Sequence, residues 1–210
     1  MMQLVIGDRN YSSWSLRPWL MLKQAGIPFE EISIRLREAG TKAEILKHSP
    51  SGKVPCLIDG QTVIWDSLAI GEYLAEQVPS LWPSDARMRA EARSISAEMH
   101  SGFAALRNDM PMEVSAYKPT EGRTPDAEAD IARIVSIWQG CRKRFAHGGP
   151  FLFGAFSIAD AMYAPVVWRF QTYAVSLPPE ARAWMEMMAA LPAMQGWKAG
   201  AIAETQAQPK

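Results

Sequence analysis

The chain has 210 residues, of which 22 are basic and 22 are acidic, so its formal net charge at pH 7 is zero. Proteins that bind nucleic acids or anionic membrane surfaces usually carry an excess of basic residues. Because this chain has no such excess, we expect neither as a partner. No apolar run approaches the length of a membrane span, and Asp8, Arg9 and Asn10 interrupt the N-terminal stretch that a secretion signal needs, so we expect a cytoplasmic protein.

The cysteine and histidine residues show no spacing typical of a metal or redox site. Cys56 and Cys141 are far apart, and neither belongs to a CxxC pair. His48, His100 and His147 form no HxxH or HExxH pattern. We therefore expect two reduced structural thiols and no bound metal.

The first 80 residues alternate short apolar runs with segments of helical periodicity. The expected elements are a strand over 3–6, a helix that starts near Trp14 or Ser15 and ends at 25, a strand over 29–36, a helix over 41–47, strands over 54–58 and 62–65, and a helix from 66 to about 77. Thr41 and Glu44 have the spacing of a capping box, and Asp59-Gly60 is a hairpin signal between the last two strands. This βαβαββα order predicts a thioredoxin-like α/β domain over residues 1–78.

The chain after residue 78 carries helical patterns only. The prolines in 79–84 interrupt any helix, and we therefore expect a linker between two domains there. The expected elements beyond it are one long helix over 85–110, an exposed loop over 112–125, a second long helix over 131–145 packed antiparallel to the first, a buried helix over 161–173, two helices after Pro178-Pro179 and Pro192, and a frayed end over 205–210. Ser157 and Asp160 have the spacing of a capping box before the buried helix. Residues 85–210 are therefore predicted to form an all-α helical bundle.

The segment Tyr11-Ser12-Ser13-Trp14-Ser15 joins the first expected strand to the first expected helix. Free N–H groups and the positive dipole end at a helix start favour an anion, and a serine hydroxyl there can donate to a thiolate. Lowering the pKa of a thiol from about 8.5 by about two units makes it mostly ionised at pH 7. The alternative is that these serines only cap the helix.

Two further segments have features of a peptide-binding site. Pro55 opens a strand after Val54, which suggests a cis X-Pro bond and a Val54 main chain that pairs with a bound peptide. The alternative is an ordinary turn before an edge strand. Asp66 and Ser67 place a carboxylate and a hydroxyl at a second helix start, where they suit the two charged ends of an amino acid. The alternative here is a simple N-cap.

Over essentially the full chain, the pattern resembles the soluble (cytosolic) glutathione S-transferase superfamily, in its bacterial serine-type, zeta-like branch. The motifs that carry the resemblance are Ser12-Ser13-Trp14-Ser15-Leu16-Arg17, Gly52-Lys53-Val54-Pro55, Asp66-Ser67 and Ser157-Ile158-Ala159-Asp160. The resemblance implies a glutathione transferase that activates the glutathione thiol for attack on an electrophilic small molecule. It also implies a homodimer.

The same resemblance implies roles for single residues. Ser12 aligns with the activating serine, and Ser13 is the reserve candidate. The implied glutathione-binding residues are Lys53, Val54, Pro55, Asp66 and Ser67, with Lys53 or His48 at the glycyl carboxylate.

The second-substrate pocket is expected between the first helix and the helix over 85–110, with Trp14, Met99, Phe103 and Arg107 as its walls. Zeta-class maleylacetoacetate isomerases usually have cysteine at the position of Trp14 and glutamate at that of Asp66, which speaks against the isomerase reaction. Glutathione-dependent isomerisation, peroxide reduction and ether cleavage remain alternatives, as does a non-catalytic binding or regulatory relative.

Overall fold

The computed structural model of the protein describes residues 1–207, and its N-terminal part is a mixed sheet flanked by helices. The elements are β1 (Met2–Gly7), α1 (Ser13–Gln24), β2 (Phe29–Ile34), α2 (Thr41–Leu46), β3 (Cys56–Asp59), β4 (Thr62–Trp65) and α3 (Ser67–Gln77). The strand order is β2-β1-β3-β4, with β1 and β2 parallel and the other neighbours antiparallel. The predicted thioredoxin-like order is therefore confirmed.

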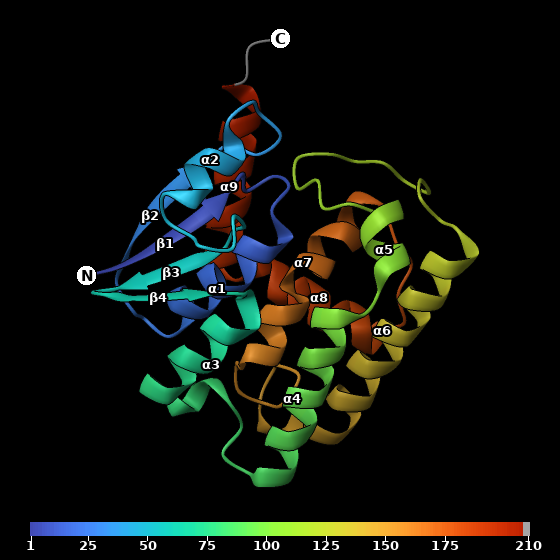
Figure 1. The fold of residues 1–210 in the computed structure, drawn as a ribbon. Coiled ribbons are helices and arrows are strands. Elements are labelled where there is room, and N and C mark those ends of the chain that lie inside the picture. Colours follow the sequence, from blue (N-terminus) through green and yellow to red (C-terminus); the bar gives the residue numbers. More distant parts are fainter. Residues whose placement is uncertain (208–210) are drawn as a thin grey trace.

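The alternation of side chains along β1 separates the two faces of this sheet. Leu4 and Ile6 belong to the large core that also contains side chains of α1 and α3, whereas Val5 packs with Ile45 of α2 and with Cys56. In Figure 1, α1 and α3 accordingly lie on the side of the sheet that faces the helical half of the molecule. The start of α1 is thus held at the boundary between the two halves.

The predicted capping box at the start of α2 is wrong. The N-cap is Gly40, and Thr41 is the first helical residue. The Thr41 hydroxyl accepts from the N–H of Glu38 at 3.1 Å and donates to the carbonyl of Arg35 at 2.8 Å. It is therefore engaged by the turn before the helix.

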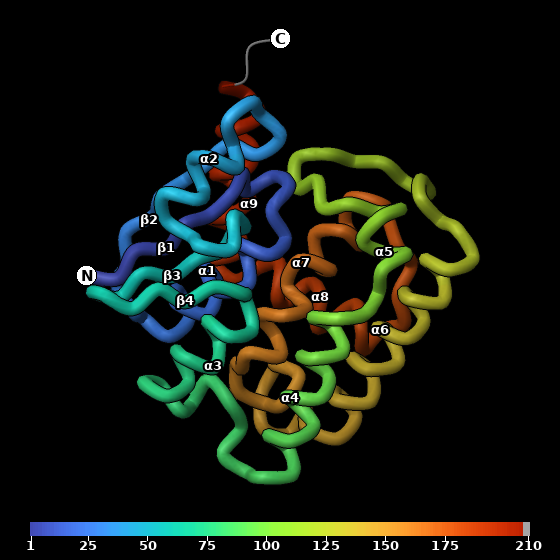
Figure 2. The backbone as a smooth tube through the Cα atoms, viewed as in Figure 1, coloured from blue at the N-terminus to red at the C-terminus, as the bar shows by residue number. Residues whose placement is uncertain are grey.

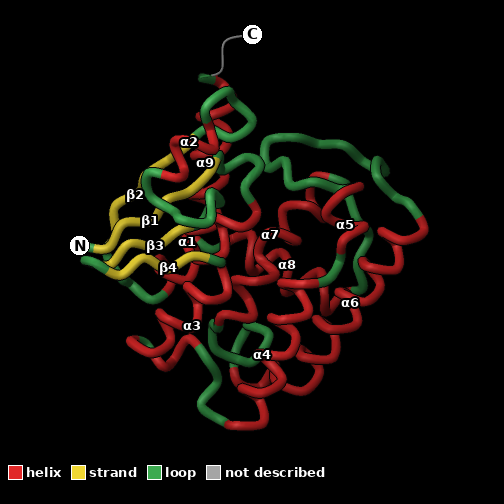
Figure 3. Tube along the Cα trace, in the orientation of Figure 1, coloured by secondary structure: helices red, strands yellow, loops and turns green. Residues whose placement is uncertain are grey.

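The remainder of the described chain is helical, as predicted, and Figure 3 shows that all strands lie on one side of the molecule. The elements are two short 3-10 helices, η1 (Pro79–Leu81) and η2 (Ala146–Gly148), and the helices α4 (Ala86–Ser101), α5 (Ala104–Asp109), α6 (Pro125–Phe145), α7 (Ile158–Thr172), α8 (Pro179–Ala190) and α9 (Pro192–Gln206).

The prediction of one continuous helix over 85–110 is wrong, because the chain breaks between α4 and α5. Phe103 has a φ of 59°, in the left-handed region that no α-helix can continue through. Gly102 before it favours a helix end. The guanidinium of Arg107 donates to the carbonyls of Met99 and Gly102, which replaces hydrogen bonds that a continuous helix would make. The apolar period runs across the break, so periodicity alone does not reveal it.

The two long helices α4 and α6 lie antiparallel, as expected. Arg133 donates two hydrogen bonds to Glu98, at 2.7 and 2.9 Å, and Arg144 forms a second bidentate pair with Glu91. Glu91, the earlier acid on α4, thus pairs with the later arginine on α6, as antiparallel helices require. Because these ion pairs are on the surface, they contribute little to the free energy of unfolding, and we use them only as evidence for the relative orientation of the two helices.

Helix α7 is the centre of the helical half, and all its residues except Gln171 are buried. It packs against α1, α4 and α8. Figure 2 shows that α9 then returns to the N-terminal segment, where the indole of Trp197 donates to the carbonyl of Arg9 at 2.9 Å. Thr205 and Gln206 belong to α9, so the expected fraying does not begin at 205, and 208–210 lie outside the described residues.

We expect Asp85→Ala to lower the free energy of unfolding by about 1 kcal/mol, because Asp85 caps α4. Its Oδ1 accepts from the N–H groups of Arg87 and Met88, at 3.0 and 2.9 Å. Urea denaturation measures the change, and Asp85→Asn, which keeps the acceptor, is the matched control. An equal loss in both variants would contradict the capping role.

Within residues 1–207, no helix combines the length and the apolar character needed to cross a membrane. The same part of the chain contains no group of three or more His, Cys, Asp or Glu side chains placed to share a metal ion. Cys56 and Cys141 are both buried free thiols, and burial raises the pKa of each, that of Cys141 to about 12. Neither thiol is therefore a nucleophile at neutral pH.

Candidate functional site

A cavity of about 550 Å³ opens where the turns around the sheet meet the end of α4. Its lining residues come from α1, from the turn before β3, from the end of β4, from the start of α3 and from α4: Trp14, Ser51, Lys53, Val54, Pro55, Trp65, Asp66, Ser67 and His100. All five glutathione-binding residues that the family resemblance implies are among them. His48, the other candidate for the glycyl carboxylate, is not, and its carbonyl accepts from the thiol of Cys56.

The turn before β3 brings an unpaired stretch of main chain to this cavity. The Val54-Pro55 peptide bond is cis, as expected. The ladder of β3 with its neighbours begins only at Cys56. Within residues 1–207, the N–H and C=O groups of Val54 make no hydrogen bond. Because backbone groups in folded proteins are normally paired, this N–H and C=O are available to an extended ligand.

The start of α3 brings a carboxylate and a hydroxyl to the same cavity. Asp66 is the N-cap, and its Oδ1 accepts from the N–H groups of Leu68 and Ala69, at 2.8 and 3.3 Å. Its Oδ2 lies 2.7 Å from Nε2 of His100. Burial alone would raise the pKa of Asp66, but these hydrogen bonds, led by that of His100, outweigh it and hold the pKa below its usual value. The carboxylate is therefore ionised at neutral pH.

Ser67, the first residue of α3, is 1% exposed, and its hydroxyl has no hydrogen-bond partner within the described chain. A buried hydroxyl without a partner costs about 1–3 kcal/mol. A polar ligand in the cavity would supply the missing partner.

Ser12 and Ser13 lie at the start of α1 and are buried, and neither is among the cavity-lining residues. Ser12 is the N-cap: its Oγ accepts from the N–H of Ser15 at 3.4 Å and lies 2.7 Å from the Ser15 hydroxyl. The Ser15 hydroxyl in turn accepts from the N–H of Gly7 at 3.1 Å. Ser12 therefore caps α1. When the Ser15 hydroxyl donates to Ser12, the hydroxyl proton of Ser12 is free to bond a ligand.

Comparison with known proteins gives the family of the chain. The model of the glutathione S-transferase N-terminal domain matches residues 11–77, and that of the C-terminal domain matches residues 124–197. The chain belongs to the glutathione S-transferase family. It is 34% identical to the maleylacetoacetate isomerase of Rattus norvegicus and 30% identical to a probable maleylacetoacetate isomerase of Caenorhabditis elegans, each over 81% of this chain and 79% of the relative.

A solved structure shows the same fold. A glutathione transferase homologue from Burkholderia, crystallised with bound glutathione, superposes with a TM-score of 0.71 over 99% of both chains, at 22% identity.

Trp14 lines the cavity on one side and contacts the buried guanidinium group of Arg17 on the other. The guanidinium carbon of Arg17 lies 4.3 Å from the Trp14 ring centroid, and that of Arg107 lies 4.6 Å away. Arg17 is fully buried, and its Nη1 and Nη2 have no partner within the described chain. Burial, and then the nearby charges of Arg107 and Arg169, lower the pKa of Arg17 well below its ordinary value. An anion in the cavity would offset this charge.

The structure does not bring all of the expected second-substrate residues to the cavity. Trp14 lines it, and Arg107 contacts Trp14. Met99 and Phe103 are buried in the main core and are not among the lining residues. The helical spacing of these two residues is typical of core positions, and both lie in the core.

Sequence reasoning missed three lining residues, Ser51, Trp65 and His100. His100 directly follows Met99, so a polar aromatic residue beside an expected pocket position was the available signal. It lies next to Met99 along α4 but on the face toward the cavity.

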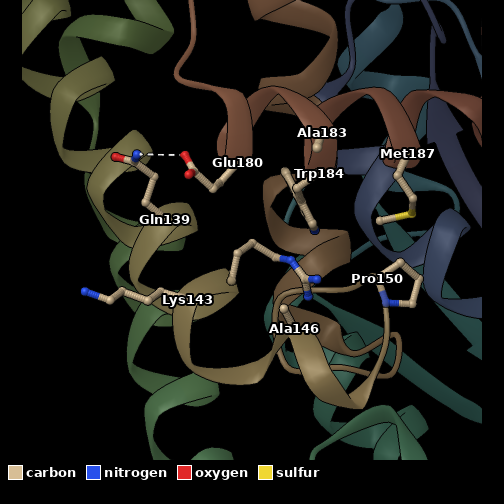
Figure 4. Close-up of a pocket in the computed structure, with 9 residues that line it drawn as sticks. Gln139, Lys143, Ala146, Pro150, Glu180, Ala183, Trp184 and Met187 are labelled. Carbon is tan, nitrogen blue, oxygen red and sulfur yellow. Dashed lines mark hydrogen bonds between the residues drawn. The ribbon is translucent and has the colours of Figure 1, made fainter.

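A larger cavity, of about 740 Å³, lies in the helical half between α6 and α8 (Figure 4). Its walls carry Arg142 and Lys143 from α6 and Trp184 and Met187 from α8. None of the residues expected from the motifs belongs to it. We therefore place the functional site at the smaller cavity.

Proposed function

We propose that the chain is a glutathione transferase that binds glutathione in the smaller cavity and activates its thiol for attack on an electrophilic small molecule. The observation that carries the proposal is the convergence, on one cavity beside the start of α1, of the unpaired Val54 main chain, the ionised Asp66 and the unpartnered Ser67 hydroxyl. These groups are complementary to a γ-glutamyl tripeptide. Family membership supports the same reading.

Each polar group has a distinct task in this proposal. Asp66 binds the ammonium of the γ-glutamyl unit, because its carboxylate is ionised. The unpartnered Ser67 hydroxyl, at the positive end of the α3 dipole, binds the carboxylate of the same unit. The Val54 main chain pairs with that of the cysteinyl unit. Lys53 meets the glycyl carboxylate, since it lines the cavity whereas His48 does not.

Bound glutathione supplies the nucleophilic sulfur, and the start of α1 stabilises its negative charge. The Ser15 hydroxyl, fixed by the N–H of Gly7, donates to Ser12, so that the Ser12 hydroxyl can donate to the sulfur. The dipole of α1 and the buried charge of Arg17 act in the same direction. Ser13 is the alternative donor, since its hydroxyl makes no hydrogen bond within the described chain.

Isomerisation is the second candidate reaction, because relatives of at least 30% identity are named as maleylacetoacetate isomerases. Glutathione would then add to the substrate and leave again, whereas a transferase keeps it in the product. Product analysis by mass spectrometry distinguishes the two. Trp14 and Asp66, which differ from the usual isomerase residues, favour transfer.

The proposal includes a cytoplasmic homodimer. The large apolar side chains of Val63 and Trp65 on β4 are 37% and 47% exposed, which suits a surface that a second copy covers.

Titration of the bound thiol tests the proposed function directly. We expect ultraviolet absorbance of the glutathione thiolate to appear below pH 7 on the wild-type protein, and Ser12→Ala to raise the apparent pKa by about one unit, through loss of one hydrogen bond to a charged acceptor. Ser13→Ala is the matched control and should leave the titration unchanged. A shift in Ser13→Ala alone would move the donor role to Ser13, and absence of glutathione binding would overturn the proposal.

A further inference from the structure

His100 connects the helical half of the molecule to the acidic group of the cavity. It lies in the last turn of α4, and its Nε2 is 2.7 Å from Oδ2 of Asp66. Its ring meets the edge of the Trp14 ring, with 5.4 Å between the centroids. His100 also lines the cavity, and its side chain is 29% exposed. No other side chain of the described helical half lines this cavity.

The two oxygens of Asp66 have separate partners. The N–H groups of Leu68 and Ala69 occupy Oδ1, which completes the cap of α3. Within residues 1–207, Oδ2 is bonded by His100 alone. Capping of α3 therefore does not need His100.

A count of lone pairs shows that a ligand can share this carboxylate. An ionised carboxylate offers about four acceptor positions. Two amides and one imidazole occupy three of them. One position on Oδ2 is left for an ammonium, and the imidazole fixes its direction by fixing the side-chain rotamer.

We propose that His100 is a positioning residue for the γ-glutamyl ammonium of glutathione, which it orients by holding Oδ2 of Asp66. This inference rests on the proposed function, because it requires that Asp66 binds glutathione. It makes the affinity for glutathione depend on the placement of α4, although every other polar ligand belongs to the thioredoxin-like half.

The backbone conformation of Asp66, the residue that His100 contacts, is unusual. Asp66 has a φ of 76°, which is rare for a residue other than glycine and is typical of strained functional positions. Its side chain is 44% exposed, so packing does not restrict its rotamer. The cap holds Oδ1 in place, and within residues 1–207 only His100 holds Oδ2.

The test separates the hydrogen bond of His100 from its ring. His100→Phe keeps the ring against Trp14 and removes the donor, whereas His100→Gln places an amide nitrogen at a reach similar to that of Nε2. His147→Phe, at an exposed position on η2, is the control. Calorimetric titration with glutathione gives Kd, and turnover of chlorodinitrobenzene gives KM and kcat.

We expect His100→Phe to raise Kd and KM for glutathione about tenfold, as loss of a hydrogen bond to a charged group does, with kcat within about twofold of wild type. His100→Gln should recover most of the affinity, and His147→Phe should match the wild type. In an Asp66→Asn background, His100→Phe should change Kd by less than about twofold, because the two residues act through one contact.

Unchanged Kd in His100→Phe, or a penalty of the same size in the Asp66→Asn background, would overturn the positioning role alone. A wild-type protein that does not bind glutathione would overturn the proposed function and the positioning role with it. If His100→Phe does not fold, His100→Asn, whose amide ends too short to reach Asp66, takes its place with the same expected result.

Discussion

Replacing Asp160 by alanine is expected to lower the free energy of unfolding by about 3–5 kcal/mol, a large part of the stability of a domain of this size. The Asp160 carboxylate is completely buried at the start of α7. It accepts from the N–H of Leu152 at 2.9 Å, from the N–H and hydroxyl of Ser157 at 3.0 and 3.1 Å, and from the indole of Trp184 at 3.1 Å. Alanine leaves these donors buried without an acceptor.

The effect of this substitution should depend on pH in a defined direction. Burial raises the pKa of Asp160 to about 6, although its hydrogen bonds act against the shift. Between about pH 4 and pH 6 Asp160 therefore holds its proton more tightly in the folded protein than in the unfolded chain, and its contribution to wild-type stability falls as pH rises through this window. Asp160→Ala lacks this titration, so the loss of stability should be larger at pH 4.5 than at pH 7.5.

Urea denaturation at the two pH values measures both effects. Ser157→Ala is the matched control, because it removes one of the donors and leaves the carboxylate with its other partners. We expect it to cost about 1 kcal/mol. A loss from Asp160→Ala no larger than that from Ser157→Ala would show that Asp160 does not organise this part of the core.

The sequence predicted those parts of the site that depend on neighbouring residues. Val54-Pro55 and Asp66-Ser67 each lie at the junction of two elements, and the junction itself places their groups at the cavity. Lys53, in the same turn, was implied by the family resemblance that Gly52-Lys53-Val54-Pro55 carries. Local chemistry of this kind, a proline before a strand or an acid before a helix, is visible without knowledge of the tertiary fold.

Contacts between distant segments were not predictable in the same way. The bond of His100 to Asp66 joins α4 to the start of α3, and the two positions show no pattern that links them. Among residues 1–207, Arg17 has no acidic partner and lies against Trp14, contrary to the general rule for buried charges. Both features arise where the two halves of the molecule meet, and the sequence does not encode that geometry locally.

Periodicity gave the right faces but not the right ends of helices. Met99 and Leu106 are both buried, as their spacing predicts, although they belong to separate helices. The break between them depends on the left-handed Phe103 and on the hydrogen bonds of Arg107, neither of which changes the hydrophobic period. The same break sets the end of α4, and with it the position of His100.

Replacing Asp66 by alanine is expected to weaken glutathione binding about 100-fold, equivalent to about 2.7 kcal/mol, because the γ-glutamyl ammonium loses its charged partner. Asp66→Asn separates the causes. It retains an acceptor for the N–H groups of Leu68 and Ala69, so that α3 stays capped, and it replaces the charged Oδ2 by an amide NH2, which cannot accept from the ammonium. If the charge is what binds the ammonium, the asparagine variant should lose most of the affinity while its unfolding midpoint stays close to that of wild type.

The pH dependence of this affinity follows from the lowered pKa of Asp66. A carboxyl group whose pKa is depressed stays ionised until the pH falls below its ordinary value of about 3.8, so its contribution is present above that value and is lost on acidification through the depressed pKa. Between pH 5 and pH 7, Asp66 should therefore add no slope to a calorimetric titration of glutathione. Asp85→Ala, which removes the same kind of cap from α4 away from the cavity, is the control and should leave Kd unchanged. Equal affinities in Asp66→Asn and wild type would place the ammonium elsewhere, because a neutral amide cannot replace an ion pair without loss.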